Sequence, residues 1–234
     1  MKECFYNYVT QTSILYNYLD VLQNNICTKC NLGASKPIVY RGNLKADILL
    51  VGEGPGKTEE EVGLPFTGVS GQLLDKIFES IDLDTNKDML LSNCIMCRPK
   101  APEGSGRQNL TPNEEQLDAC FPYVRNLIRI IKPKVIIACG RIALGELLGD
   151  RKVKMKDYEG KWITYNKEYD LFGPRGEEKI TINPNIPMFA MCHPSYILRQ
   201  KDFMSADEYN NFKLNIKNYM NEFKKGYMKI KNAT

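Results

Sequence analysis

Four short apolar runs constrain the fold of this chain more than any other feature of its sequence. They lie in "ADILLVG", "DMLLSN", "KPKVIIACG" and "IPMFAMCH". Continuous hydrophobicity over so few residues is typical of strands that are covered on both faces. The intervening segments carry apolar residues at helical spacing, as in "SGQLLDKIFESI". Strands that alternate with helices predict an α/β fold of three αβα layers around a central four-stranded, mainly parallel sheet.

The whole chain, residues 1–234, is expected to form one domain. Its length suits a single medium domain, and it contains no internal repeat and no low-complexity tract. We expect three parts in this domain: an N-terminal helix over 5–24, a core over about 25–200 and a C-terminal helix over 205–225.

Two helices carry start signals in the sequence. Thr111 is expected to cap a helix, with Pro112 in the first turn and Glu114 completing a capping box. Ser205 and Glu208 are expected to form a second box at the start of the last helix. That helix carries an apolar stripe that we expect to lie in the core: Tyr209, Phe212, Ile216, Met220 and Phe223.

The charge balance permits a nucleic-acid partner without requiring one. The chain has 32 Lys+Arg against 28 Asp+Glu, a net charge of +4 and a pI near 8.5. No segment is apolar over the length of a bilayer, and the first residues lack the apolar run of a signal peptide. We therefore expect an intracellular monomer without membrane contact, in the cytoplasm or with the DNA in a nucleoid or nucleus.

Eight cysteines are unusual in a chain expected to be intracellular, where disulfides are rare. Two pairs have the C-x-x-C spacing, "CTKC" and "CIMC", which lets two thiolates converge on a metal or a cluster. One interpretation is a zinc site built from both pairs: Cys27, Cys30, Cys94 and Cys97. Cys139 and Cys192 lie inside apolar runs and are expected in the core.

Three polar features follow the apolar runs directly. "GEGPG" follows the first run, Asn93 ends the second, and His193, which is the only histidine, ends the fourth. Ligands of parallel α/β sheets bind beyond the carboxyl ends of the strands. The sequence therefore predicts that these three features meet in one crevice.

The stretch "GEGPGKTEEEVGLPFTGVSGQLL" resembles the first motif of the family 4 uracil-DNA glycosylases, the iron–sulfur members of their superfamily. Further matches follow in the family's order in "SNCIMCRP", "IKPKVIIACGRIALGELLG", "GKW" and "HPSYILR", and together they cover roughly residues 24–200. The resemblance implies a DNA repair enzyme that flips uracil out of DNA and hydrolyses its N-glycosidic bond, leaving an abasic site. The implied partner is uracil-containing DNA, single- or double-stranded.

The resemblance assigns the catalytic roles to two residues. Glu53 matches the acidic residue that positions the attacking water, and His193 matches the histidine that bonds uracil O2. A fixed donor from His193 would favour the departing uracil anion in the transition state more than in the substrate.

Four further residues match positions that bind the substrate, and Ser195 is a fifth candidate for a substrate contact. Gly54 faces the base with its backbone, Glu59 crowds the C5 side against thymine, and Phe66 stacks on the flipped base. Asn93 reads the uracil edge, because its amide both donates and accepts. Ser195 is expected to contact a phosphate.

The resemblance also implies a [4Fe–4S] cluster held by Cys27, Cys30, Cys97 and Cys120. Cys94 remains a competing ligand, and segments 100–109 and 167–186 look like insertions. Two other functions stay open: a relative that acts on another modified pyrimidine, and a non-catalytic DNA-binding or partner protein with the same fold.

Overall fold

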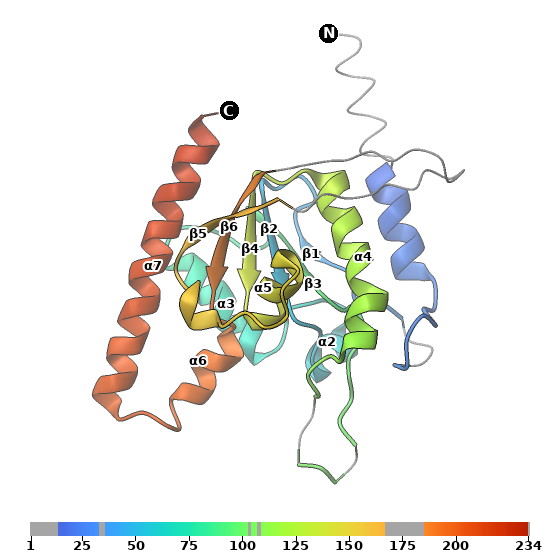
Figure 1. The fold of residues 1–234 in the computed structure, drawn as a ribbon, viewed down its shortest axis with the longest axis horizontal. Coiled ribbons are helices and arrows are strands. Elements are labelled where there is room, and N and C mark those ends of the chain that lie inside the picture. The colour runs from blue at the N-terminus through green and yellow to red at the C-terminus, as the bar shows by residue number, and fades with distance from the viewer. Residues whose placement is uncertain (1–13, 33–35, 103, 107–108, 167–184, 234) are drawn as a thin grey trace.

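The computed structural model describes residues 14–32, 36–102, 104–106, 109–166 and 185–233 (Figure 1). A helix over 14–24 comes first, and residues 5–13 of the predicted N-terminal helix lie outside the described part. The elements that follow are, in chain order, β1 (Arg41–Gly42), β2 (Ile48–Gly52), α2 (Lys57–Val62), α3 (Val69–Glu79), β3 (Met89–Asn93), α4 (Glu114–Ile131), β4 (Val135–Cys139), α5 (Arg141–Leu148), a short 3-10 helix (Met155–Asp157), β5 (Trp162–Tyr165), β6 (Ile186–Met191), α6 (Pro194–Gln200) and α7 (Ala206–Asn232).

The sheet has six strands in the order β1-β3-β2-β4-β6-β5. The four predicted strands form its parallel centre, with β2 between β3 and β4. β1 and β5 pair antiparallel at the two edges. The predicted count of four strands is therefore too low. The two edge strands were not predicted, because β1 has only two residues and β5 is partly exposed along most of its length.

Alternate residues of the central strands point into two separate hydrophobic clusters. On β2, Leu49 and Val51 pack with α4, α5 and the helix over 14–24. Ile48 and Leu50 face the other way and pack with α3 and α7. Figure 1 shows α4 and α7 at opposite sides of the sheet. The prediction of an αβα arrangement with a mainly parallel sheet is confirmed.

The two predicted helix starts have different outcomes. Ser205 Oγ accepts the Glu208 N–H at 3.3 Å, and the Glu208 carboxylate accepts the Ser205 N–H at 2.8 Å, as expected for a capping box. At α4 the cap is Asn113, not Thr111. The Asn113 side chain accepts the Gln116 N–H at 2.9 Å, and Gln116 Oε1 accepts the Asn113 N–H at 3.1 Å. This Asn–Gln box starts the helix two residues later, which leaves Thr111 to face a cavity.

The C-terminal helix α7 is longer than predicted, since it continues past residue 225. Its residues Ile216, Met220 and Phe223 are buried, while Tyr209 and Phe212 are only partly so. The insertion predicted at 167–186 lies almost wholly outside the described residues. In the part of the chain that the structure describes, no helix has the length and hydrophobicity needed to cross a membrane.

Candidate active site

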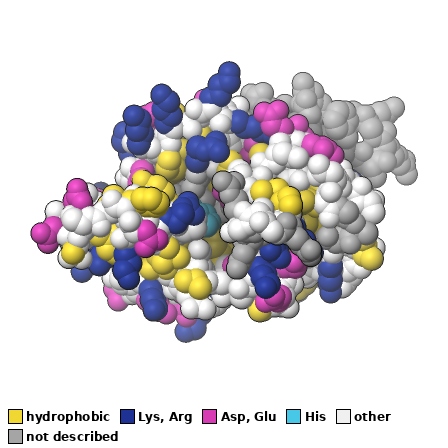
Figure 2. Space-filling view, turned by 90° about the horizontal axis from the view of Figure 1, so that it is seen from below, with side chains coloured by type: hydrophobic (Ala, Val, Ile, Leu, Met, Phe, Trp, Pro, Cys, Tyr) yellow, Lys and Arg dark blue, Asp and Glu magenta, His cyan; other side chains and the backbone are white. Residues whose placement is uncertain are grey.

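A cavity of about 510 Å³ lies beyond the carboxyl ends of the parallel strands. Figure 2 shows the histidine at the bottom of a hollow on this face, with Lys and Arg side chains around it. All seven predicted catalytic and substrate-binding residues line the cavity: Glu53, Gly54, Glu59, Phe66, Asn93, His193 and Ser195. Residues as far apart in the sequence as Glu53 and Ser195 are thus brought to one space, as the crevice prediction required.

At the end of β2, Gly52 has no side chain, and this leaves room for Phe66 and Asn93 in the cavity wall. A Cβ on Gly52 would lie 2.5 Å from the Phe66 ring and 2.6 Å from Asn93 Oδ1. Gly52 is also the register partner of Asn93 on the neighbouring strand β3. The aromatic ring and the amide therefore pack directly against bare backbone at this position.

Phe66 adopts an uncommon backbone conformation. Its φ is +57°, and the residue is buried. A Cβ on Gly71 would lie 1.9 Å from the Phe66 carbonyl oxygen, so only glycine at 71 leaves room for this turn. Such conformations persist where the surroundings over-determine them, and they cluster at ligand sites.

Asn93 ends β3 with its side chain in the cavity wall. It is 2% exposed, yet its amide makes no hydrogen bond to another described residue. Buried amides are rarely left unpaired in proteins. Both the donor and the acceptor of Asn93 are therefore available to a ligand.

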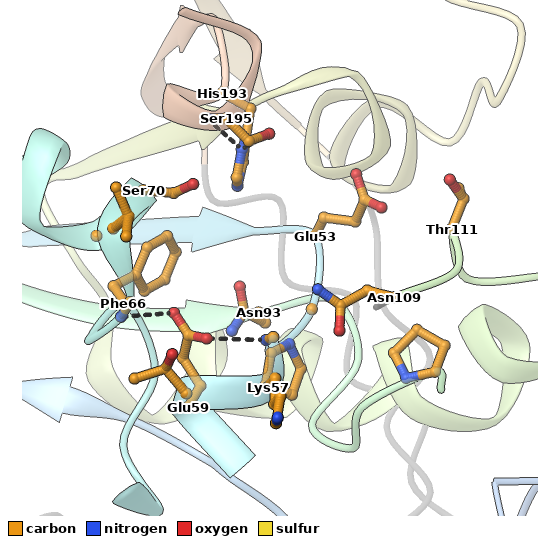
Figure 3. Close-up of a pocket in the computed structure, with 18 of the residues that line it drawn as sticks. Glu53, Lys57, Glu59, Phe66, Ser70, Asn93, Asn109, Thr111, His193 and Ser195 are labelled. Carbon is orange, nitrogen blue, oxygen red and sulfur yellow. Dashed lines mark hydrogen bonds between the residues drawn. The ribbon is translucent and has the colours of Figure 1, made fainter. Parts of the chain in front are cut away.

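Glu59 connects two loops of the cavity. Its carboxylate accepts the Gly56 N–H at 3.1 Å and the Gly68 N–H at 3.0 Å (Figure 3). The "GEGPG" loop and the loop that carries Phe66 are thereby held to α2. The thymine-excluding role implied by the resemblance stays a prediction, whereas the bracing role follows from these contacts.

His193 caps helix α6 while its ring lines the cavity. Its Nδ1 accepts the Ser195 N–H at 3.2 Å and lies 2.8 Å from Ser195 Oγ. An accepting Nδ1 assigns the proton of the neutral ring to Nε2, which is left as a donor for the cavity. Burial, together with the nearby Arg199 charge, lowers the pKa of His193 to about 4. The imidazole is therefore neutral at physiological pH.

Glu53 lies on the opposite side of the same space from Phe66 (Figure 3). Burial raises the pKa of its carboxyl group above the ordinary value, while the nearby Arg141 and Arg199 charges lower it. The two guanidinium groups thus oppose the burial effect and favour the ionised carboxylate.

The cavity wall also contains residues that the sequence did not assign to the site, among them Asn109, Thr111 and Arg199. Arg98 Nε donates to Asn109 Oδ1 at 2.7 Å, so the Asn109 amide nitrogen is turned the other way, toward the "GEGPG" loop. Arg199 follows Ser195 by four residues and shares its face of α6. The four-residue spacing from Ser195 was the sequence signal that could have identified Arg199. Asn109 lies in the long 100–109 loop, where no sequence pattern pointed to the site.

The segment after His193 forms the short helix α6. Pro194 occupies the first helical position, where its missing N–H costs nothing, and His193 supplies the cap. Ile197 is 3% exposed and belongs to the core, whereas Tyr196 is 43% exposed. Of these two bulky residues, Tyr196 is the one that a macromolecule can reach.

A comparison of the sequence with known protein families matches the region that contains this cavity. A sequence profile described as the uracil DNA glycosylase superfamily matches residues 39–217, which include every residue of the cavity wall. The chain belongs to this superfamily. The matched region includes Cys97 and Cys120 but leaves out Cys27 and Cys30, so it covers only two of the four cysteines predicted to hold a cluster.

Individual members of the superfamily are similar over most of the chain. The type-4 uracil-DNA glycosylase of Thermotoga maritima is 33% identical over 177 residues, which are 75% of this chain and 79% of that protein. That of Pyrobaculum aerophilum is 39% identical over 140 residues, which are 58% of this chain and 67% of that protein. That of Saccharolobus solfataricus is 33% identical over 155 residues, or 63% and 68% of the two chains.

Four thiols of this superfamily member line a second, smaller cavity between the N-terminal segment and α4: Cys27, Cys30, Cys97 and Cys120. Burial and the neighbouring thiols raise the pKa of Cys97 to about 11. Burial raises the pKa of Cys120 to about 12, and the Met96 N–H, which donates to Cys120 Sγ at 3.3 Å, opposes that rise. Cys94 is fully buried in the core and does not line this cavity.

Four cysteine thiolates are the usual ligand set of an iron–sulfur cluster. Zn–S bonds of about 2.3 Å would bring tetrahedral ligands to about 3.8 Å from one another. Among the described residues, no three His, Cys, Asp or Glu side chains are grouped closely enough to hold one ion. Four thiols that nevertheless share one cavity suit a cluster, which spreads its ligands over several metal atoms.

Proposed function

We propose that this protein is a monofunctional DNA repair glycosylase. It flips uracil out of single- or double-stranded DNA and hydrolyses the N-glycosidic bond, leaving an abasic site. The observation that carries the proposal is one cavity walled by an aromatic ring, a neutral histidine, a carboxylate and an amide that has no partner among the described residues. The relatives named above as uracil-DNA glycosylases support it.

The amide of Asn93 accounts for recognition of the base. It accepts from uracil N3–H and donates to O4, whereas cytosine presents the opposite donor and acceptor at these two atoms. Phe66 stacks on the face of the flipped base. An unpaired amide in a buried position discriminates strongly, because the wrong base leaves it without partners.

Bond cleavage needs charge stabilisation at both ends of the breaking bond. The electron pair of the C1′–N1 bond passes into the uracil ring, and His193 Nε2–H donates to the O2 atom that takes up negative charge. The sugar gains positive charge, which the Glu53 carboxylate stabilises. Glu53 also orients a water molecule, whose oxygen bonds to C1′ and whose proton passes to the carboxylate.

We also propose that Cys27, Cys30, Cys97 and Cys120 hold a [4Fe–4S] cluster. The shared cavity and the Met96 N–H on Cys120 support this ligand set, and the burial of Cys94 in the core favours Cys97 over it. The cluster would link the N-terminal segment to the β3–α4 connection and to α4. Its role in this chain is structural, because none of the four thiols lines the active-site cavity.

The decisive test is an excision assay on oligonucleotides. The protein is incubated with single-stranded and duplex DNA that carries uracil, thymine, cytosine or hypoxanthine, and abasic sites are cleaved with alkali. We expect strand cleavage with uracil only. Asn93→Ala should lower uracil excision roughly 10- to 100-fold, since two hydrogen bonds of about 1 kcal/mol each are lost. Asn93→Asp should also lower it and shift preference toward cytosine.

The same assay separates the two other functions. Excision of another pyrimidine with uracil left intact would favour a relative with a different substrate. DNA binding without excision of any base would favour a non-catalytic partner protein. Full uracil activity in Asn93→Ala would remove Asn93 from base recognition.

The cluster has its own test. Purified protein should be brown and contain about four iron atoms per chain. Cys97→Ala should lose the iron and much of the soluble protein, whereas Cys94→Ala should retain both. Colourless protein with one zinc per chain would refute the cluster, and iron loss in Cys94→Ala alone would show that the wrong thiol of "CIMC" was chosen.

A further inference from the structure

We infer that Arg41, on the edge strand β1, is a positioning residue for the active-site ring of Phe66. This inference rests on the proposed function, in which Phe66 stacks on the flipped base. Arg41 does not line the cavity and can act only through the backbone of Phe66.

Arg41 links the Phe66 backbone to two other elements. Its Nη1 donates to the Phe66 carbonyl oxygen at 2.7 Å. Its Nη2 donates to Thr85 Oγ1 at 2.9 Å and to the Asp75 carboxylate. Thr85 Oγ1 in turn donates to Asp75 Oδ1 at 2.7 Å. The guanidinium is therefore fixed from α3 and from the loop before β3, and its position cannot follow the Phe66 loop.

The atom that Arg41 binds, the Phe66 carbonyl oxygen, is also the atom with the least free space in this turn. The Phe66 carbonyl lies against the bare backbone of Gly71, in a residue with φ of +57°. An unfavoured conformation of this kind needs outside contacts to persist. Arg41 supplies one from a site that is itself largely buried, with 11% of its side chain exposed. Loss of this contact would let the backbone relax and turn the ring away from Asn93.

A purely structural role for Arg41 is the competing explanation. The chain offers a matched control for it, because Arg151 forms a comparable bridge to the buried Glu146 and to Asp118. None of these three residues lines the cavity. Arg151→Gln should cost stability in a similar way without moving Phe66.

A double-mutant cycle tests the inference through the single-turnover rate of uracil excision. Arg41→Gln should lower the rate about 10- to 100-fold, since a misplacement near 1 Å costs about that much. In the Phe66→Ala background the same change should lower the rate less than about twofold, because the ring through which Arg41 acts is absent. Inhibition by free uracil should weaken in Arg41→Gln and stay unchanged in Arg151→Gln.

Two outcomes would overturn the inference. One is an equal loss of rate in the Phe66→Ala and parent backgrounds, and the other is a parent-like rate in folded Arg41→Gln. If Arg41→Gln does not fold, Thr85→Val removes the hydroxyl link at nearly constant volume and should give a smaller loss that also vanishes with Phe66→Ala. In protein without DNA, the NMR chemical shifts of the Phe66 ring should change in Arg41→Gln but not in Arg151→Gln. That measurement stands even if the parent protein fails to excise uracil, a result that would refute only the proposed function.

Discussion

Replacement of His193 by alanine is expected to slow single-turnover excision of uracil by about 10²- to 10³-fold, toward the lower end of that range. The rate falls because the Nε2–H donor to the departing anion is lost, while Glu53 and the backbone amides of the "GEGPG" loop remain. Affinity for DNA should barely change, since phosphate contacts dominate binding. Rapid-quench kinetics and a binding titration of the same protein measure the two quantities.

The capping role of His193 must be separated from its catalytic role. Loss of a helix cap typically costs about 1 kcal/mol of stability. His193→Asn restores a good capping side chain for the Ser195 N–H, but its shorter amide reaches less far into the cavity. The asparagine variant should therefore recover stability fully and the rate only in part. A folded, cluster-loaded His193→Ala protein that excises uracil at the parent rate would contradict the catalytic assignment.

The pH dependence of the rate follows from the same two residues. The pKa of His193 is lowered from 6.5 to about 4, so the ring stays neutral as the pH rises through 7 to 9. Activity should hold across that window. The pKa of Glu53 is raised from 4.5, so on acidification the carboxylate takes up its proton above the ordinary value. The acid limb should therefore belong to Glu53 and disappear from the profile of Glu53→Gln, whose remaining activity should be low.

Gly52→Ala is expected to abolish most uracil excision, with a loss of at least about 10²-fold. The added methyl group would lie 2.5 Å from the Phe66 ring and 2.6 Å from Asn93 Oδ1, so the stacking ring and the reading amide must both move. Overpacking of this kind also costs about 1–3 kcal/mol of stability. Excision rates and thermal melting of the variant measure these two effects.

Gly63→Ala provides the matched control. A Cβ at Gly63 meets no atom within 4 Å, but an alanine there would be strained at φ of +79°. This variant should lose stability and keep its rate per folded molecule. A parent-like rate in Gly52→Ala would mean that the contacts of Phe66 and Asn93 with the β2 backbone are not needed for catalysis.

The central strands could be predicted because burial on both faces requires continuous hydrophobic runs. β2, β3, β4 and β6 each have that pattern, and all four were found. The edge strands could not be predicted. The two residues of β1 are too few to show a hydrophobic periodicity, and β5 is only partly buried. The cap of α4 was misplaced because "TPNEE" contains two acceptable caps, and only tertiary contacts select Asn113.

The candidate site could be predicted where residue type and strand end coincide. Asn93 and His193 each follow an apolar run directly, so sequence order alone places them at one edge of the sheet. Contacts between loops, in contrast, leave no recognisable pattern in the sequence. The clamp of Glu59 on Gly68 spans nine residues, and the contact from Arg41 to the Phe66 carbonyl spans 25. Neither follows from a periodic pattern.

The order of strands along the chain also determines when the site is completed during protein synthesis. Domains generally begin to fold from the N-terminus while the ribosome is still adding residues. β2, β3 and β4 precede β6 in the chain, and Glu53, Phe66 and Asn93 all lie before β4, but His193 follows only after β6. A nascent chain can thus form the part of the cavity wall that carries Phe66 and Asn93 before His193 has been added. A chain interrupted before β6 therefore lacks both the last central strand and the predicted donor His193.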